Sequence, residues 1–239
     1  MNILLFSPDE RVPGTAQVRL CGARAEHIRT VYGAVPGKSL RAGEIGGDIG
    51  EATLESIAGN GVTLTFRAQH PPPAKRPLTV ILALPRPKML RRMLRTVAES
   101  GVRELHLVNA RRVEKSFWQS GLLETASLEG YLLSGLEQSM DTVLPALHLH
   151  RGFRPFAEDS LPALATGRRA LLAHPGAGVS CPADGDGETL LMIGPEGGFI
   201  DYETTLAQRA GMQPVSLGSR TLRAETALAA MLGRFLATP

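Results

Sequence analysis

The sequence predicts an α/β protein in which a parallel sheet wrapped by helices follows a small β-rich barrel. Residues 1–70 carry short apolar runs separated by turn residues, a pattern typical of a small barrel. A proline-rich stretch follows at residues 71–77, and strand-like and helix-like segments then alternate over about 160 residues. We place the domain boundary in the proline-rich stretch, which gives domains of residues 1–72 and 73–239.

The first domain is predicted to contain several short strands and one helix. Asn60-Gly61 lies between two alternating runs and is the clearest hairpin signal. A helix is predicted at residues 23–32, where apolar residues recur at helical spacing. The predicted strands are residues 17–20, 38–41, 51–54 and 62–66.

The second domain begins with an uninterrupted apolar run, residues 78–84, which suits a strand buried on both faces. Residues 88–100 have an apolar side and an arginine-rich side, and Gly101 ends this predicted helix. The other predicted strands are 104–108, 146–149, 170–173, 189–193 and 215–217, and the other predicted helices are 121–138, 201–210 and 223–236.

Composition excludes several classes of protein. Hydrophobic residues make up 43% and charged residues 21% of the chain, which is typical of a globular protein. No apolar run reaches the roughly 18 residues that a membrane helix needs, and the short apolar start before Ser7 does not resemble a signal peptide. Cys21 and Cys181 are expected to be free thiols in a reducing cytoplasm. The six histidines and two cysteines are expected to form no ligand cluster, so no metal site is predicted.

The distribution of charge favours a polyanionic partner. The net charge is +3, and all but four of the 26 basic residues are arginines, whose planar fork suits phosphates. Residues 86–115 contain nine basic and three acidic residues, whereas residues 116–147 contain four acidic residues and no basic ones. This asymmetry favours one face that binds a polyanion. Codon bias is the alternative explanation of the excess of arginine, and an ordinary solvated helix face is the alternative explanation of the local basic cluster.

Three loops that follow predicted strands carry unusual residues, and ligands of parallel sheets bind at such loops. The loop 194–198 holds three glycines and Glu196, which suits close approach to a ligand, although a simple strand-to-helix turn would also use glycines. The segment 217–227 opens a helix, and Arg223 and Glu225 in it could simply pair with each other. His174 follows another strand and is either structural or a base.

Together these segments resemble the RsmE family of bacterial methyltransferases that make 3-methyluridine in 16S ribosomal RNA. The resemblance rests first on Gly194-Pro195-Glu196-Gly197-Gly198 followed by Leu217-Gly218-x-Arg220-x-Leu222-Arg223-x-Glu225-Thr226-Ala227. It extends over nearly the whole chain through His174-Pro175, Glu137-Gln138, Lys88-Met89, Glu99-x-Gly101-Val102, and His27-Ile28-x-x-Val31 with Pro36-Gly37.

The resemblance implies a PUA-like barrel followed by a SPOUT methyltransferase domain whose C-terminal segment forms a trefoil knot. It implies a cytoplasmic homodimer that binds S-adenosylmethionine and methylates N3 of a uridine in 16S rRNA of the small ribosomal subunit, usually uridine 1498. The implied cofactor-binding residues are Leu172, His174, Gly194, Pro195, Glu196, Gly197, Gly198, Leu217, Gly218, Leu222, Glu225, Thr226 and Ala227.

The implied chemistry also suggests catalytic and RNA-binding residues. Arg220 and Arg223 are candidates for stabilising a uridine anion, and Glu225 or Glu196 for accepting the N3 proton. The target base must be unpaired or extruded, since its pairing edge is methylated. The expected RNA contacts are Arg24, His27, Arg86, Lys88, Arg91, Arg92 and Arg112.

Four departures from the family pattern concern the RNA more than the cofactor. The family usually has a basic residue before the aromatic of its first strand, where this chain has Leu4-Leu5-Phe6. Thr96 replaces a lysine, Asp141 an arginine and Ser219 a proline. Two alternatives therefore stay open: a divergent paralogue that methylates another RNA position, and a non-catalytic RNA-binding or ribosome-assembly protein.

Overall fold

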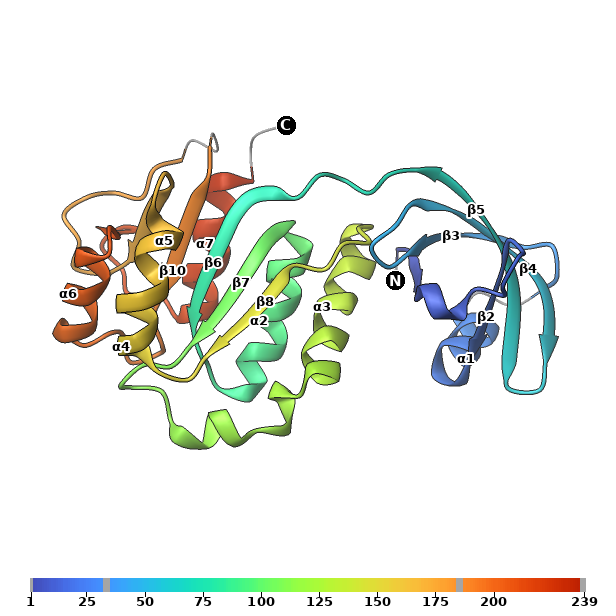
Figure 1. Ribbon diagram of the computed structural model, residues 1–239, viewed down its shortest axis with the longest axis horizontal. Helices are drawn as coiled ribbons and strands as arrows, with labels where there is room; N and C mark the ends of the chain where they lie inside the picture. Colours follow the sequence, from blue (N-terminus) through green and yellow to red (C-terminus); the bar gives the residue numbers. More distant parts are fainter. Residues whose placement is uncertain (1, 32–34, 184–186, 237–239) are drawn as a thin grey trace. The chain divides into compact units, whose positions relative to one another are not determined.

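The computed structural model describes residues 2–31, 35–183 and 187–236. The chain divides into two compact units (Figure 1). The first comprises Met1–Ala74 with Leu133–Leu144, and the second comprises Lys75–Leu132 with Pro145–Pro239. In the described ranges, no helix is long and apolar enough to cross a membrane.

The first unit is a curled five-stranded sheet in the order β1-β3-β4-β5-β2. The hairpin predicted from Asn60-Gly61 is formed by β4 and β5, but its turn is Gly59-Asn60, because Gly61 already pairs with Ala58. Phe6 and Phe66 meet edge to face in the core, with ring centroids 4.9 Å apart. The predicted helix 23–32 is α1, apart from Tyr32, which lies outside the described residues. The elements are β1 (Leu4–Phe6), β2 (Gln17–Cys21), α1 (Gly22–Val31), β3 (Ser39–Glu44), β4 (Ile49–Ala58) and β5 (Gly61–His70).

The segment Leu133–Leu144 joins this unit through backbone hydrogen bonds. The N–H of Asn2 donates to the carbonyl of Glu137 at 3.0 Å, and the N–H of Gly46 donates to the carbonyl of Thr142 at 2.8 Å. Asp141 is buried, and its Oδ1 accepts hydrogen bonds from the next two backbone N–H groups. The residue that replaces a family arginine therefore stabilises a turn here.

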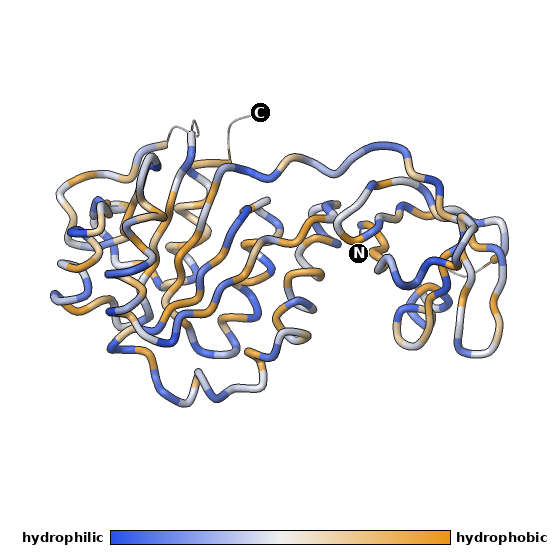
Figure 2. Tube along the Cα trace, viewed as in Figure 1, coloured by the Kyte–Doolittle hydropathy of each residue, from blue (hydrophilic) through white to orange (hydrophobic). Residues whose placement is uncertain are grey.

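The second unit is built on a six-stranded sheet in the order β11-β9-β10-β6-β7-β8, with all pairings parallel. The predicted α/β architecture is confirmed. Figure 2 shows hydrophobic residues concentrated in its central strands, as expected for strands buried on both faces. The strands are β6 (Arg76–Ala83), β7 (Val102–Val108), β8 (Ala146–His150), β9 (Arg169–Ala173), β10 (Thr189–Ile193) and β11 (Gln213–Val215).

Helices cover both faces of this sheet (Figure 1). α2 (Pro87–Glu99) and α7 (Ala224–Phe235) pack together on one face. On the other face lie α4 (Phe153–Pro155), α5 (Leu161–Ala165) and α6 (Asp201–Arg209). The other helical segments of the described chain are η1 (Pro8–Glu10), η2 (Lys115–Gln119), η3 (Gly121–Leu123), α3 (Thr125–Ser139) and η4 (Phe156–Ser160).

One predicted strand needs correction, and one helical segment was not predicted. The strand predicted at 215–217 is β11, which ends at Val215 and includes Pro214. A proline is tolerated there because β11 is an edge strand. The helical segments between Phe153 and Ala165 were not predicted, since they are short, contain two prolines and lack a continuous helical periodicity.

Candidate functional site

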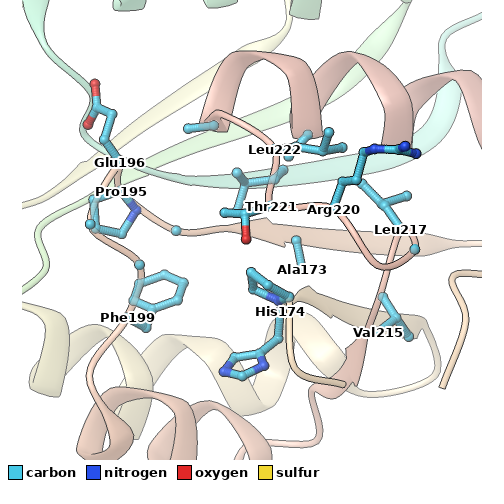
Figure 3. A pocket seen from close by; sticks show the side chains of 18 residues that line it. Ala173, His174, Pro195, Glu196, Phe199, Val215, Leu217, Arg220, Thr221 and Leu222 are labelled. Carbon is cyan, nitrogen blue, oxygen red and sulfur yellow. The ribbon is translucent and has the colours of Figure 1, made fainter. Parts of the chain in front are cut away.

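A pocket lies where three neighbouring strands of the parallel sheet end. The loops after β9, β10 and β11, with the start of α7, enclose about 210 Å³. Carboxyl ends of parallel strands meet at one edge, so these loops converge although they are far apart in the sequence. The lining residues are Ala173, His174, Pro175, Ile193, Gly194, Pro195, Glu196, Gly197, Gly198, Phe199, Val215, Leu217, Gly218, Arg220, Thr221, Leu222, Ala224 and Ala227 (Figure 3).

The glycine loop after β10 is both a turn and a wall of the pocket. The N–H of Gly198 donates to the carbonyl of Pro195 at 2.8 Å, which closes a tight turn. A Cβ placed on Gly194 would lie 3.2 Å from the ring of Phe199, and one on Gly197 would lie 3.1 Å from Arg112. Glycine therefore lets neighbouring side chains approach the backbone closely, which supports the interpretation as a tight turn, whereas close approach to a ligand stays a prediction.

Glu196 points away from the centre of the pocket (Figure 3). Its Oε1 accepts a hydrogen bond from the backbone N–H of Arg86 at 3.4 Å, and it lies 3.5 Å from Nε of the same residue. The carboxylate is thus held by the start of α2. This geometry does not favour Glu196 as the proton acceptor.

The loop after β11 is shaped by one hydroxyl group. Ser216 Oγ accepts from the N–H of Gly218 at 3.1 Å and lies 3.0 Å from its carbonyl oxygen, to which it donates. Gly218 has φ +117°, a conformation that other residues rarely adopt. The loop then presents Leu217, Thr221 and Leu222 to the pocket, with the Thr221 hydroxyl aimed inward (Figure 3).

The start of α7 offers backbone donors beside this loop. Arg223 is the N-cap residue and makes no side-chain cap hydrogen bond, so the first amides of the helix have no such partner. These amides and the helix dipole favour an anionic group. In the described part of the chain, no ion pair joins Arg223 to Glu225, which argues against the simple pairing considered above. The guanidinium of Arg220 points away from the centre of the pocket (Figure 3).

His174 has a clear structural role and also lines the pocket. Its N–H donates to the carbonyl of Val215 at 2.9 Å, and its ring Nδ1 accepts from the N–H of Gly176 at 3.2 Å. Both interactions hold the turn after β9. The structural alternative for this histidine is therefore supported by its contacts.

Most of the predicted cofactor residues converge on the pocket, although their binding roles stay predictions. Leu172 is fully buried in β9, and Glu225 and Thr226 lie in the first turn of α7 without lining the pocket. Of Arg220, Arg223 and Glu225, only Arg220 is in the lining, and Glu196, the other candidate proton acceptor, also lines the pocket. Sequence reasoning missed the polar lining residue Thr221 and the apolar walls, which flank the predicted positions: Ala173, Pro175, Ile193, Phe199, Val215 and Ala224.

The residues predicted to contact RNA lie in both units. Arg24 and His27 are on α1, where Arg24 forms an ion pair with Glu10. On α2, Lys88 and Arg92 are exposed, and the guanidinium of Arg91 lies 5.7 Å from the ring centroid of Tyr131. Arg112 donates through Nη1 to the carbonyl of Gly197, so it reaches the glycine loop. Arg86 holds Glu196, as described above.

The prediction that the histidines form no ligand cluster is wrong. Donor atoms of Glu104, His106 and His148 lie within 4.8 Å of one another. Alternate residues of a strand share one face, and β7 pairs with β8 in a register that places His106 beside His148. Residues 42 positions apart become neighbours in this way, which no sequence spacing shows.

Comparison with known proteins identifies the family. The model of the RNA methyltransferase domain matches residues 72–236. The ribosomal RNA small subunit methyltransferase E of Treponema pallidum is 32% identical over 99% of this chain and 91% of its own length. The chain belongs to the ribosomal RNA small subunit methyltransferase E family. The family member from Synechocystis is 28% identical and covers 94% of this chain and 73% of its own length.

Solved structures agree with this assignment at the level of the fold. The methyltransferase E of Neisseria gonorrhoeae, crystallised with S-adenosylmethionine, aligns with a TM-score of 0.76 at 21% identity over 96% of this chain and 95% of its own. A Legionella pneumophila protein described as a methyltransferase with bound S-adenosylmethionine aligns with a TM-score of 0.78 at 23% identity, over 99% and 97%. The resemblance to the methyltransferase E family is confirmed, whereas the trefoil knot stays a prediction.

Proposed function

We propose that this chain is an S-adenosylmethionine-dependent methyltransferase that acts on N3 of a uridine in small-subunit ribosomal RNA. The observation that carries the proposal is the pocket at the ends of β9, β10 and β11. It gathers a glycine loop, an apolar wall and a free helix start in a chain that belongs to the methyltransferase E family. Bound S-adenosylmethionine in the Neisseria relative supports the choice of cofactor.

The pocket residues fit S-adenosylmethionine chemically. Leu217, Leu222 and Ile193 give apolar surface that suits an adenine ring. A Cβ at Gly194 or Gly197 would be crowded by Phe199 or Arg112, and the glycines leave bare backbone for a ligand to meet. The uncapped first turn of α7 suits the carboxylate of the methionine part. When bound, S-adenosylmethionine would supply an electrophilic methyl group.

The chain's own residues would position and ionise the acceptor base. Arg220 and Arg223 are exposed, lie on the segment between the pocket and α7, and would stabilise the anion formed when N3 loses its proton. Glu225, in the first turn of α7, would accept that proton. The remaining task is to hold N3 in line with the methyl group, which is a matter of positioning.

Binding of the RNA would involve both units. We assign residues 1–72 to an RNA-binding barrel and residues 73–239 to the methyltransferase domain, with Arg24, His27, Lys88 and Arg92 on phosphates. A homodimer is part of this proposal.

Methyl transfer from labelled S-adenosylmethionine to small ribosomal subunits that lack the modification tests the proposal. We expect 3-methyluridine when the labelled nucleoside is identified. Failure of the chain to bind S-adenosylmethionine in calorimetry would overturn the enzyme assignment. A labelled nucleoside other than 3-methyluridine would overturn the acceptor alone.

A second acceptor in RNA is favoured by the departures from the family pattern. Asp141 is buried in a turn and Thr96 donates its hydroxyl to the carbonyl of Arg92 at 3.2 Å, so neither position supplies a cation. Mapping of modified nucleotides in ribosomal RNA from a deletion strain distinguishes this alternative. Loss of a modification other than 3-methyluridine would favour it.

A further inference from the structure

Four titratable side chains gather on one face of the parallel sheet, on the strands farthest from β9 and β11. Glu104 and His106 alternate on β7, and His148 and His150 alternate on β8. We call these four residues the histidine cluster. β6 and β10 separate it from β9 and β11 in the sheet order, and none of its members lines the pocket. The proposed methyl transfer does not use this cluster.

Two histidine nitrogens of the cluster lie from one carboxylate oxygen at the distance that separates ligands of a small metal ion. Nε2 of His106 and Nε2 of His148 lie 3.2 and 3.1 Å from the same oxygen, Oε1 of Glu104. Ligands about 2.0–2.1 Å from a tetrahedral zinc ion are separated from each other by about 3.3 Å. The third pair, the two histidine nitrogens, lies within 4.8 Å. The rings of His106 and His148 stack with centroids 4.6 Å apart, so His148 would turn about its side-chain bonds to aim its nitrogen at a shared ion.

His106 carries a buried nitrogen without a hydrogen-bond partner. Its side chain is 6% exposed, and Nε2 makes no hydrogen bond although it faces Glu104. Nδ1 lies 2.9 Å from Nε2 of His150. If Nδ1 donates to His150, a lone pair on Nε2 faces a carboxylate, which is unfavourable unless a cation lies between them.

The groups behind these three atoms resemble the supporting shell of a metal site. The hydrogen bond between Nδ1 of His106 and Nε2 of His150 would fix the orientation of the His106 ring, as such partners do for ligating histidines. The second oxygen of Glu104 accepts a hydrogen bond from Thr79 at 3.4 Å, and Arg168 donates to the Thr79 hydroxyl at 3.2 Å. Phe156 packs against the ring of His150, with centroids 4.5 Å apart.

We propose that Glu104, His106 and His148 form a binding site for a transition-metal dication of the Zn²⁺ class. Two imidazoles and one carboxylate are ligands for zinc and its first-row neighbours, whereas Mg²⁺ and Ca²⁺ prefer oxygen ligands alone. The side chain of His148 is 46% exposed, so an ion can enter from solvent and keep a water as its fourth ligand.

Metal titration of the untagged full-length protein tests the site. After treatment with a chelator, calorimetry should show one saturable equivalent of Zn²⁺, and Co²⁺ should give the visible absorption of a tetrahedral complex. His148→Ala should lower Zn²⁺ affinity at least tenfold and abolish the Co²⁺ absorption. Because His148 is partly exposed, this variant is expected to fold, which circular dichroism checks.

His70→Ala is the matched control, since His70 is an exposed histidine of the first unit outside the cluster. It should bind Zn²⁺ as the unaltered protein does. Glu104→Gln should weaken binding as His148→Ala does. The proposal fails if the unaltered protein binds no Zn²⁺, or if His148→Ala binds it with unchanged affinity. Either result would leave the cluster a hydrogen-bonded polar group and would not affect the proposed methyl transfer.

Discussion

Arg86 holds the carboxylate of Glu196 at the first turn of α2, with its backbone N–H 3.4 Å and its Nε 3.5 Å from Oε1. Arg86 is the N-cap residue of α2, so the carboxylate also lies near the positive end of the helix dipole. This relationship ties the glycine loop to the helix from outside the pocket. Arg86 thereby binds the carboxylate of Glu196, which the sequence analysis named as a candidate proton acceptor.

Glu196→Gln should therefore have a small effect on methyl transfer. The amide oxygen can still accept from Arg86, and a partly exposed ion pair contributes at most about 1 kcal/mol, so kcat/KM should fall less than about fivefold. Steady-state transfer to small ribosomal subunits measures this. A hundredfold decrease would mean that the carboxylate takes part in the reaction.

Arg220→Ala and Arg223→Ala should each lower kcat by about a hundredfold, because each would remove a cation that stabilises the developing anion. Both residues are exposed, so the free energy of unfolding should change by no more than about 0.5 kcal/mol. Single-turnover kinetics and urea denaturation check the two effects. Arg209→Ala, an exposed arginine at the end of α6, is the control. Equal effects of all three substitutions on kcat would contradict the assigned roles.

Gly218→Ala should destabilise the loop after β11. Gly218 has φ +117°, where a side chain adds strain of about 1–3 kcal/mol, although space around it is open. The Ser216 hydroxyl can bond to both backbone groups of residue 218 only while this conformation is kept. Cofactor affinity, measured by calorimetry, should fall with thermal stability. Gly178→Ala has open space without a positive φ and should change neither.

The two thiols should react at very different rates. Burial raises the pKa of the Cys181 thiol, whereas Cys21 is exposed. Only the thiolate reacts with iodoacetamide, and a raised pKa leaves less of it at any pH below that value. Mass spectrometry after brief treatment at about pH 8 should find Cys21 modified and Cys181 intact. Rapid modification of Cys181 in the folded protein would contradict its burial.

The sequence predicted the strands of the second unit well where burial dictates composition. β10 has the predicted bounds, because five buried residues between glycine-containing loops leave little ambiguity. β11 was displaced by two residues, since an edge strand is less constrained by apolar pattern. The segment Phe153–Ala165 was missed because its turns are stabilised by packing against α6 and not by a repeating face.

The candidate site likewise has one part that the sequence predicted and another part that it did not. The glycine loop and the start of α7 were recognisable because their backbone geometry requires particular residues, such as Gly218. Phe199 and Ile193 were missed because a wall residue can be any apolar residue of suitable size. The histidine cluster depends on the order and register of β7 and β8, which are tertiary properties.

Glu137 on α3 should make folding depend on pH in a direction that its burial fixes. Burial raises its pKa, and His27 and Arg24 offset this only in part. Because the folded pKa lies above the unfolded one, its contribution to stability is complete below about 4.5 and is lost as pH rises through the folded pKa. Glu137→Gln removes this titration, so its stability relative to the unaltered protein should increase between about pH 4 and pH 7 in urea denaturation. Glu129→Gln, exposed on the same helix, should show no such trend, and an equal difference at both pH values for Glu137→Gln would contradict the assignment.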